Sequence, residues 1–273
     1  TPTTTTHPTT KKQQQTQQNK TQHKSNHWTT NFYIWRIMKN KKILVRDIGR
    51  HSFLEAWKYQ EKIFQKIIDQ KVQNRSKYKK IKTKNFLILT EHNHVYTIGK
   101  SGDVSNLLID KNELANREIE YYKINRGGDI TYHGPGQIMV YPILDLDNFF
   151  TDINLYLRKL EDVVIYTLKS YDLKGFTIKG ETGVWVKDEN GLSKKICAFG
   201  IRASRWVTMH GLCLNVNPDL SYFDFIIPCG IKDKGVTSLS HLKKEVIDIN
   251  QVKSKLVENF ELVFNAEINF ETN

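Results

Sequence analysis

The sequence has few cysteines and no long apolar run. Three cysteines among 273 residues are too few and too widely spaced for a disulfide scaffold, and they fit a reducing compartment. A membrane-spanning helix needs about 18–20 consecutive apolar residues, and no apolar run in this sequence, including the one around residues 163–168, approaches that length. The chain is therefore predicted to be neither a disulfide-stapled secreted domain nor a membrane protein.

Acidic residues are absent from the first 46 positions, which hold nine lysines and arginines. The whole chain has 41 Lys and Arg against 29 Asp and Glu, which leaves 32 against 29 for positions 47–273. The formal charge of +12 therefore belongs to the N-terminal segment. Because the remainder is almost neutral, the high isoelectric point does not indicate a nucleic-acid partner.

Residues 1–30 contain eleven Thr and six Gln, and Trp28 is their only apolar side chain apart from proline. Such a segment cannot bury enough surface to offset its ordering entropy, so we predict a disordered tail over 1–30 and a single domain over 31–273. A segment without acidic residues is also typical of a mitochondrial transit peptide, although this one has no arginine. A biased low-complexity tail is the alternative.

From residue 31 onward, short strand patterns alternate with a few helical ones. Ser52 and Glu55 form a capping box that predicts a helix start, and apolar spacing predicts further helices over about 152–168 and 250–264. Strands are predicted from short apolar runs at 86–90, 95–98, 138–141, 184–186 and 196–201. This order predicts an α/β or α+β domain, a mixed sheet with flanking helices.

Four of the 15 glycines fall within ten residues, in the segment Arg-Gly-Gly-Asp-Ile-Thr-Tyr-His-Gly-Pro-Gly-Gln at 126–137. Glycines at this density let a backbone approach a ligand closely. Arg126, Thr131 and His133 supply donors and an acid/base group between them, which favours a ligand-binding loop over a purely structural turn. Neither a phosphate-binding G-x-x-x-x-G-K-[ST] nor a dinucleotide-binding G-x-G-x-x-G motif is present.

The three cysteines differ in their local sequence. Cys197 and Cys213 lie in strand-like runs, where cysteine usually acts as a small buried apolar residue. Cys229 follows a proline and precedes a glycine, in a predicted turn, which makes it the better candidate nucleophile. A thiol with a pKa of about 8.5 needs a nearby cation or base to react, and Lys194 and Lys195 are candidates.

No metal site is predicted. The cysteines are spaced 16 residues apart, which matches no zinc pattern. His92, His94 and His210 lack a third ligand at a fixed spacing, so structural or surface roles are favoured for them.

Taken together, these segments resemble the octanoyl (lipoyl) transferase family. The resemblance spans Val45 to Leu239. Its matching blocks are 126–137 followed by Tyr-Pro at 141–142, Lys-Ile-Cys-Ala-Phe-Gly-Ile-Arg at 195–202, Ser-Arg-Trp-Val-Thr-Met-His-Gly-Leu-Cys-Leu-Asn-Val-Asn at 204–217, Ile-Pro-Cys-Gly-Ile at 227–231 and Gly-Val-Thr-Ser-Leu at 235–239.

The resemblance implies the fold of biotin and lipoate protein ligases and a transfer of octanoyl groups from acyl carrier protein to a lysine of lipoyl domains. Those domains would belong to 2-oxoacid dehydrogenase complexes and to the glycine cleavage H protein. Cys229 would carry the acyl group as a thioester, while Lys195 would lower the thiol pKa and shuttle the proton. The residues implied to line the substrate pocket are Arg126, Gly127, Gly128, Asp129, Ile130, Thr131, Tyr132, His133, Ala198, Phe199, Gly200, Gly211, Leu212 and Cys213.

An octanoyl thioester is already activated, so the reaction implied by the resemblance requires no ATP, and no metal is expected. The role of His133 stays open between orienting the substrate and capping the loop. The family in eukaryotes, together with the acid-free tail, implies a mitochondrial location, and a cytoplasmic enzyme of bacterial type is the alternative. The rival functions are an ATP-dependent lipoate or biotin ligase and a non-catalytic protein that binds lipoyl domains or acyl carriers.

Substitution of the implied catalytic pair tests this hypothesis directly. We expect Cys229→Ser to abolish octanoyl transfer, because the hydroxyl does not form a thioester. We expect Lys195→Ala to reduce the transfer rate strongly while leaving the fold intact. Transfer rates and far-ultraviolet circular dichroism of the purified variants measure both effects. Near-native turnover of Cys229→Ala would show that the nucleophile is another residue.

Overall fold

The computed structural model describes Thr1 and residues 39–77, 80–227 and 235–271. Residues Asn40–Asn273 form one compact unit, which contains every helix and strand described below. Apart from Thr1, the predicted tail over 1–30 lies outside the described residues, and so does Cys229.

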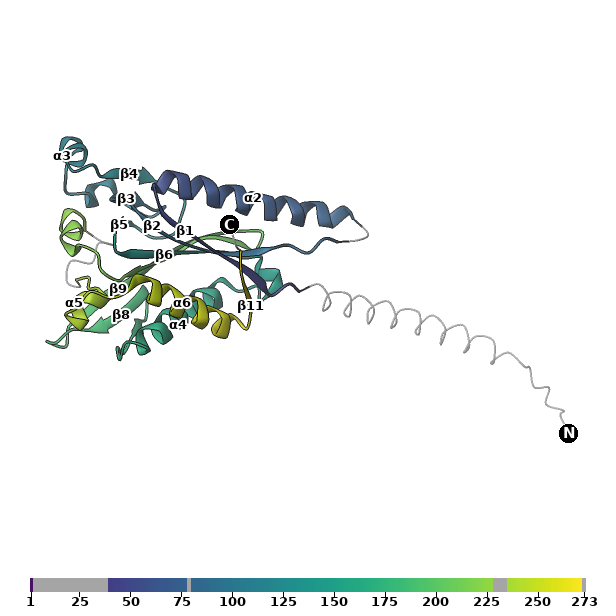
Figure 1. Cartoon of the computed structure of the whole chain (residues 1–273). Coiled ribbons are helices and arrows are strands. Elements are labelled where there is room, and N and C mark those ends of the chain that lie inside the picture. Colours follow the sequence, from purple (N-terminus) through teal and green to yellow (C-terminus); the bar gives the residue numbers. More distant parts are fainter. Residues whose placement is uncertain (2–38, 78–79, 228–234, 272–273) are drawn as a thin grey trace. The chain divides into compact units, whose positions relative to one another are not determined.

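An eight-stranded mixed sheet forms the centre of this unit (Figure 1). In spatial order its strands are β11 (Glu267–Phe270), β1 (Lys42–His51), β2 (Asn85–His92), β6 (Gln137–Ile143), β10 (Val207–Asn215), β9 (Ser193–Ser204), β8 (Glu181–Lys187) and β7 (Phe176–Ile178). Strand β1 pairs in parallel with β11 and β2, and all other neighbours pair antiparallel.

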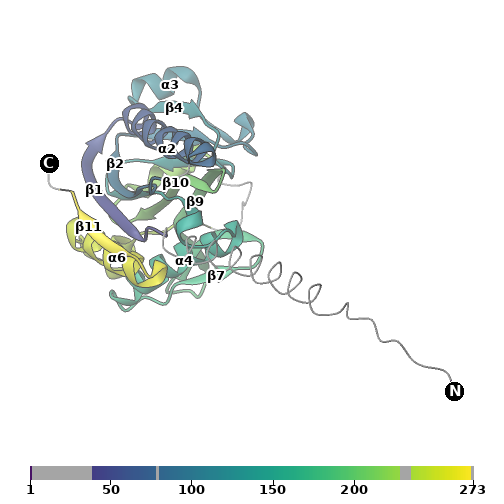
Figure 2. The ribbon, with the colours of Figure 1, turned by 90° about the vertical axis from the view of Figure 1, so that its right-hand side faces the viewer.

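A second sheet has three strands, in the order β4 (Glu120–Lys123), β3 (Val95–Ile98) and β5 (Ile130–His133). Helix α2 (Phe53–Ser76) covers one face of the large sheet, and α4 (Ile153–Lys169) and α6 (Ile249–Phe264) cover the other (Figures 1 and 2). The short elements are α3 (Lys111–Asn116), α5 (Leu239–Lys243) and the 3-10 helices η1 (Val104–Asn106), η2 (Leu146–Asn148) and η3 (Leu220–Phe225).

Apolar side chains cover both faces of the central strands. In β6, Met139 and Tyr141 belong to the core under α2, whereas Ile138 and Val140 belong to the core under α4 and α6. Alternate residues of a strand point to opposite faces, so a strand enclosed on both sides is apolar throughout. This explains why β2 and β6 appear in the sequence as continuous apolar runs without alternation.

The three predicted helices and the central strands are confirmed. Helix α2 begins at the predicted capping box, in which the Ser52 hydroxyl oxygen accepts from the backbone N–H of Glu55. Asp152 caps α4 in the same way, and the strands predicted at 184–186 and 196–201 pair antiparallel as β8 and β9. Strand β3 confirms the prediction at 95–98, but the sequence did not predict β4 and β5, its partners in the three-stranded sheet. Among the described residues, no helix is both long and apolar enough to cross a membrane.

The N-cap of α2 contributes measurably to stability. Replacing Ser52 with Ala removes the acceptor for the Glu55 N–H, so we expect a loss of about 1 kcal/mol of unfolding free energy. Ser52→Thr keeps the hydroxyl and serves as the control, with near-native stability expected. Urea denaturation measures both variants, and equal midpoints for Ala and Thr would contradict a stabilising cap.

Candidate active site

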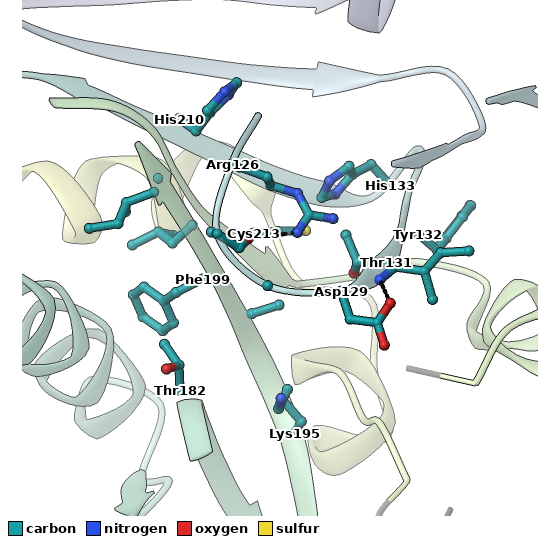
Figure 3. A pocket seen from close by; sticks show the side chains of 18 of the residues that line it. Arg126, Asp129, Thr131, Tyr132, His133, Thr182, Lys195, Phe199, His210 and Cys213 are labelled. Atoms are coloured by element: carbon teal, nitrogen blue, oxygen red, sulfur yellow. Dashed lines mark hydrogen bonds between the residues drawn. The ribbon is translucent and has the colours of Figure 1, made fainter. Parts of the chain in front are cut away.

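A cavity of about 480 Å³ opens between the large and the small sheet (Figure 3). This volume lies within the roughly 300–1,000 Å³ typical of small-molecule sites. Its lining includes Lys195 and every residue implied for the substrate pocket: Arg126, Gly127, Gly128, Asp129, Ile130, Thr131, Tyr132, His133, Ala198, Phe199, Gly200, Gly211, Leu212 and Cys213. The fold thus brings together three blocks of sequence, 126–133, 195–200 and 211–213, of which the first ends 78 positions before the last begins.

The buried side chain of Arg126 anchors the glycine-rich segment. Its Nη2 donates to the carbonyl oxygen and the hydroxyl of Thr97 at 2.7 and 2.9 Å, and its Nη1 donates to the carbonyl oxygen of Gly127 at 2.9 Å. A Cβ atom at Gly200 would lie only 2.7 Å from Arg126 Cδ, so β9 requires glycine at this position. Gly128 has φ +87°, a conformation that glycine adopts without steric cost.

A β-bulge places the side chain of Lys195 on the cavity side of β9. Val184 pairs with Cys197 but Trp185 pairs with Lys195, so β9 has one residue more than β8 at this point. Both Ile196 and Cys197 consequently face the apolar core, and Lys195 faces the cavity. In regular alternation Lys195 would share the core face with Cys197, so the bulge redirects it. The Nζ atom lies 4.7 Å from the centre of the Trp185 ring, which favours a cation there.

The described residue just before the Cys229 segment is fixed to the cavity wall. The backbone N–H of Ile227 donates to the carbonyl oxygen of Asn106 at 2.8 Å. The side-chain amide of Asn106 donates in turn to Asp129 Oδ2, also at 2.8 Å. Asp129 lines the cavity, so two hydrogen bonds connect Ile227 to the glycine-rich segment.

The described residues just after the Cys229 segment are fixed to Lys195 itself. The Lys195 N–H donates to the carbonyl oxygen of Gly235 at 3.0 Å, and the Thr237 N–H donates to the Lys195 carbonyl oxygen at 3.0 Å. Val236, between these two anchors, also lines the cavity. The described residues on either side of the segment 228–234 are therefore connected to lining residues of the same cavity, Ile227 to Asp129 through Asn106, and Gly235 and Thr237 to Lys195.

His92 is a structural histidine beside the cavity. Its Nδ1 donates to the carbonyl oxygen of His51 at 2.9 Å, and its Nε2 accepts from the Tyr141 hydroxyl at 2.7 Å. A carbonyl oxygen only accepts, so the partners assign the proton to Nδ1. Burial lowers the pKa of His92 to about 4, and the ring is neutral at physiological pH.

His210 lines the cavity, a position that the sequence did not reveal. Its backbone has φ +59° within β10, and its N–H donates to Gln60 Oε1 of α2 at 3.1 Å. Burial, together with the neighbouring Arg126 and Arg202, lowers its pKa to about 3. Within the described ranges, no group of three His, Cys, Asp or Glu side chains is arranged to hold a metal.

The sequence patterns do not distinguish several other lining residues from residues of the apolar core. They include Phe53, Met139, Tyr141, Leu157 and Thr182. Leu157 lies in the apolar stripe of α4 and Met139 in a buried strand, so pattern alone does not distinguish a cavity wall from a filled core. Cys213 belongs to the core and also lines the cavity, and it is only 4% exposed. Burial raises the pKa of its thiol, so Cys213 is a poor nucleophile.

Comparison with known proteins shows the family to which the chain belongs. The sequence model of the lipoyl protein ligase A/B catalytic domain matches residues 52–261. An octanoyltransferase of Christiangramia forsetii is 55% identical over 85% of this chain and 100% of its own length, and one of Cytophaga hutchinsonii is 48% identical over 84% and 95%. The chain belongs to the octanoyltransferases of the lipoyl protein ligase A/B family. It is accordingly an acyltransferase enzyme.

Solved structures agree with the family assignment at the level of the fold. Lipoate-protein ligase A bound with ATP superposes with a TM-score of 0.60 at 16% identity, covering 86% of this chain and 88% of the ligase. The bi-partite lipoate protein ligase of Thermoplasma acidophilum gives 0.59 at 17% identity, covering 86% of each chain. The predicted fold class, a mixed sheet with flanking helices of the lipoate ligase type, is confirmed.

The predicted mitochondrial location is wrong. Octanoyltransferases that are 55% and 53% identical to this chain, those of Flavobacterium johnsoniae and Flavobacterium psychrophilum, come from bacteria, which have no mitochondria. An acid-free, Thr- and Gln-rich segment satisfies one compositional criterion of a transit peptide, but composition alone does not identify a targeting sequence.

The neutral state of His92 predicts a pH dependence of stability. Its pKa is lowered from 6.5 to about 4 in the folded state, so between these values the unfolded chain binds the extra proton and stability falls with falling pH. His92→Gln should reduce this loss between pH 7 and pH 4.5 by up to about 3 kcal/mol. Urea unfolding across that range measures it.

His51→Gln is the matched control, because the side chain of His51 is exposed, the hydrogen bond to His92 comes from its backbone carbonyl oxygen, and its charge is the smallest cause of the lowered pKa of His92. We expect this variant to follow the wild-type pH profile. If His92→Gln also followed it, His92 would not be the residue whose protonation destabilises the fold.

Proposed function

We propose that this enzyme transfers an octanoyl group from octanoyl-acyl carrier protein to a lysine of a lipoyl domain through a thioester on Cys229. The observation that supports it most strongly is the identity of about half the residues to octanoyltransferases along almost their whole length. Octanoyl transfer in lipoate biosynthesis is the function that these relatives support. The proposal adds three details: octanoyl-acyl carrier protein as the donor, the thioester on Cys229 and a lysine of a lipoyl domain as the acceptor.

In the first half-reaction the Cys229 thiolate attacks the carbonyl carbon of the octanoyl thioester. A new carbon–sulfur bond forms and the bond to the carrier's thiol breaks. The Lys195 ammonium protonates the departing thiolate. The position of Lys195 supports this role, because its backbone binds Gly235 and Thr237 beyond the Cys229 segment while its side chain faces the cavity.

In the second half-reaction the acceptor lysine attacks the acyl carbon in its amine form. The amide bond forms, Cys229 leaves as a thiolate, and the proton lost by the incoming amine passes to Lys195, which is then an ammonium again. Thioester exchange is nearly thermoneutral and amide formation is favourable, so the cycle requires neither ATP nor a metal. A ping-pong order of substrates follows from the covalent intermediate.

The acceptors we propose are lipoyl domains of 2-oxoacid dehydrogenase complexes and the glycine cleavage H protein. A structural relative of this chain was solved as a lipoate protein ligase with its E2 lipoyl domain, which supports an acceptor of this kind. The rival function is ATP-dependent ligation of a free acid, since another structural relative binds ATP. The absence of both nucleotide-binding motifs from the sequence, together with the match to transferases at three times the identity, favours transfer.

The acyl-enzyme is directly observable by intact-mass measurement. We expect the purified protein, mixed with octanoyl-acyl carrier protein without ATP, to gain the mass of one octanoyl group. Hydroxylamine should remove the adduct, since it cleaves thioesters, and Cys229→Ser should not form it.

Two outcomes would contradict the proposal. An adduct that forms equally on Cys229→Ser would place the acyl group on another residue. No adduct and no lipoyl-domain octanoylation without ATP, but octanoylation from octanoic acid with ATP, would identify a ligase. Lys194→Ala provides a matched control for Lys195→Ala, since both lysines lie in β9 and only Lys195 lines the cavity.

A further inference from the structure

A hydrogen-bonded chain of three buried side chains runs along the cavity wall. Arg126 Nη2 donates to Thr97 Oγ1 at 2.9 Å, and Thr97 Oγ1 lies 3.3 Å from His133 Nε2. Thr97 is fully buried in β3, and Arg126 and His133 are 7% and 5% exposed. Arg126 and His133 line the cavity, whereas Thr97 stands behind them and was not among the candidate residues.

The donor and acceptor capacities of these groups fix the position of a proton. A guanidinium only donates, so the Thr97 hydroxyl accepts from Arg126 and directs its own hydrogen elsewhere. Among the described residues, His133 Nε2 is the other hydrogen-bond partner of this hydroxyl, so an Nε2–H tautomer would leave the buried hydroxyl hydrogen without an acceptor. His133 Nε2 is therefore unprotonated, and the proton of the neutral ring sits on Nδ1.

Two observations support a neutral His133. Burial and the positive charge of Arg126 both lower its pKa well below the usual value. The ring also stacks against Phe53 at an interplanar angle of 8°, in an apolar part of the wall. A neutral imidazole with its proton on Nδ1 presents one N–H donor there.

That donor has no partner within the described part of the chain. His133 Nδ1 is buried, with no hydrogen-bond acceptor in reach. An unsatisfied buried donor costs about 1–3 kcal/mol, so a ligand atom that accepts this hydrogen bond is favoured. Within an octanoyl group the carbonyl oxygen is the one strong acceptor, since the rest of the chain is hydrocarbon.

We propose that Thr97 is a positioning residue that holds His133 with its proton on Nδ1, and that this N–H donates to the carbonyl oxygen of the acyl group in the cavity. The assignment of the carbonyl rests on the proposed function, whereas the tautomer does not. Negative charge develops on this oxygen when the acyl carbon is attacked, so a donor fixed in advance stabilises the transition state more than the bound substrate. His133 then acts as a neutral hydrogen-bond donor and not as a base.

The tautomer is measurable by NMR on the full chain labelled with ¹⁵N-histidine. The signals of His133 are those that disappear in His133→Phe. We expect an Nδ1–H tautomer in the wild type, a loss of this preference in Thr97→Val, and its recovery in Thr97→Ser. Octanamide, an uncharged carbonyl probe, should shift the Nδ1 resonance, and 1-octanol, which lacks a carbonyl, should shift it less.

Transfer kinetics test the consequence for catalysis. Thr97→Val should lower kcat by about tenfold or more and His133→Phe by about 10²–10³-fold, the cost of losing one carbonyl-polarising donor, with little change in KM. Thr97→Ser should restore kcat. Thr167→Val is the matched control: this buried threonine of α4 donates to Val163, away from the cavity, and wild-type kinetics are expected.

Three results would overturn the proposal: an Nε2–H tautomer in the wild type, an Nδ1 resonance that octanamide leaves unchanged, or wild-type tautomer and kcat in Thr97→Val. The NMR measurements need neither acyl carrier protein nor Cys229. Absence of transfer in the wild-type protein, together with the expected octanamide shift, would therefore contradict the proposed function and leave the His133 assignment supported.

Discussion

The cavity depends on one buried guanidinium. Arg126 joins the glycine-rich segment to β3 through two hydrogen bonds to Thr97 and one to Gly127, and its stem packs against β9 where Gly200 has no side chain. A buried cation is costly unless its donors are used, so these hydrogen bonds hold the glycine-rich segment against β3 while the stem of Arg126 packs on β9. The same contacts determine how the Thr97 hydroxyl and the His133 ring are oriented.

The second constraint is the extra residue in β9. Strand alternation alone would turn Lys195 toward the apolar core, and the bulge at Ile196 turns it toward the cavity instead. The backbone of the same lysine binds the residues that follow the Cys229 segment, while Asn106 holds Ile227 before it. The position of the proposed acid/base group thus depends on one β-bulge in the hairpin of β8 and β9.

Sequence patterns predicted the long elements well and the short ones poorly. The capping box at Ser52 and the apolar stripes of α4 and α6 are local signals repeated over several turns, so the helices are found where predicted. The short strand β3 lies where it was predicted, at 95–98, but its partners β4 and β5 were not predicted, and β11 pairs with β1 more than 200 residues away in sequence. Such pairings are decided by tertiary contacts that no local pattern records.

For the site, the sequence by itself determined which blocks are candidates for the chemistry: the glycine-rich segment at 126–133, Lys195 and the Pro-Cys-Gly tripeptide at 228–230 stand out by composition and by resemblance. Only the tertiary structure decided that Met139 and Tyr141 form cavity wall, and that Thr97 connects Arg126 to His133. The physical reason is that residue type fixes what a group can donate, accept or attack, whereas its partners and its protonated atom depend on neighbours that only folding brings within 3 Å or so.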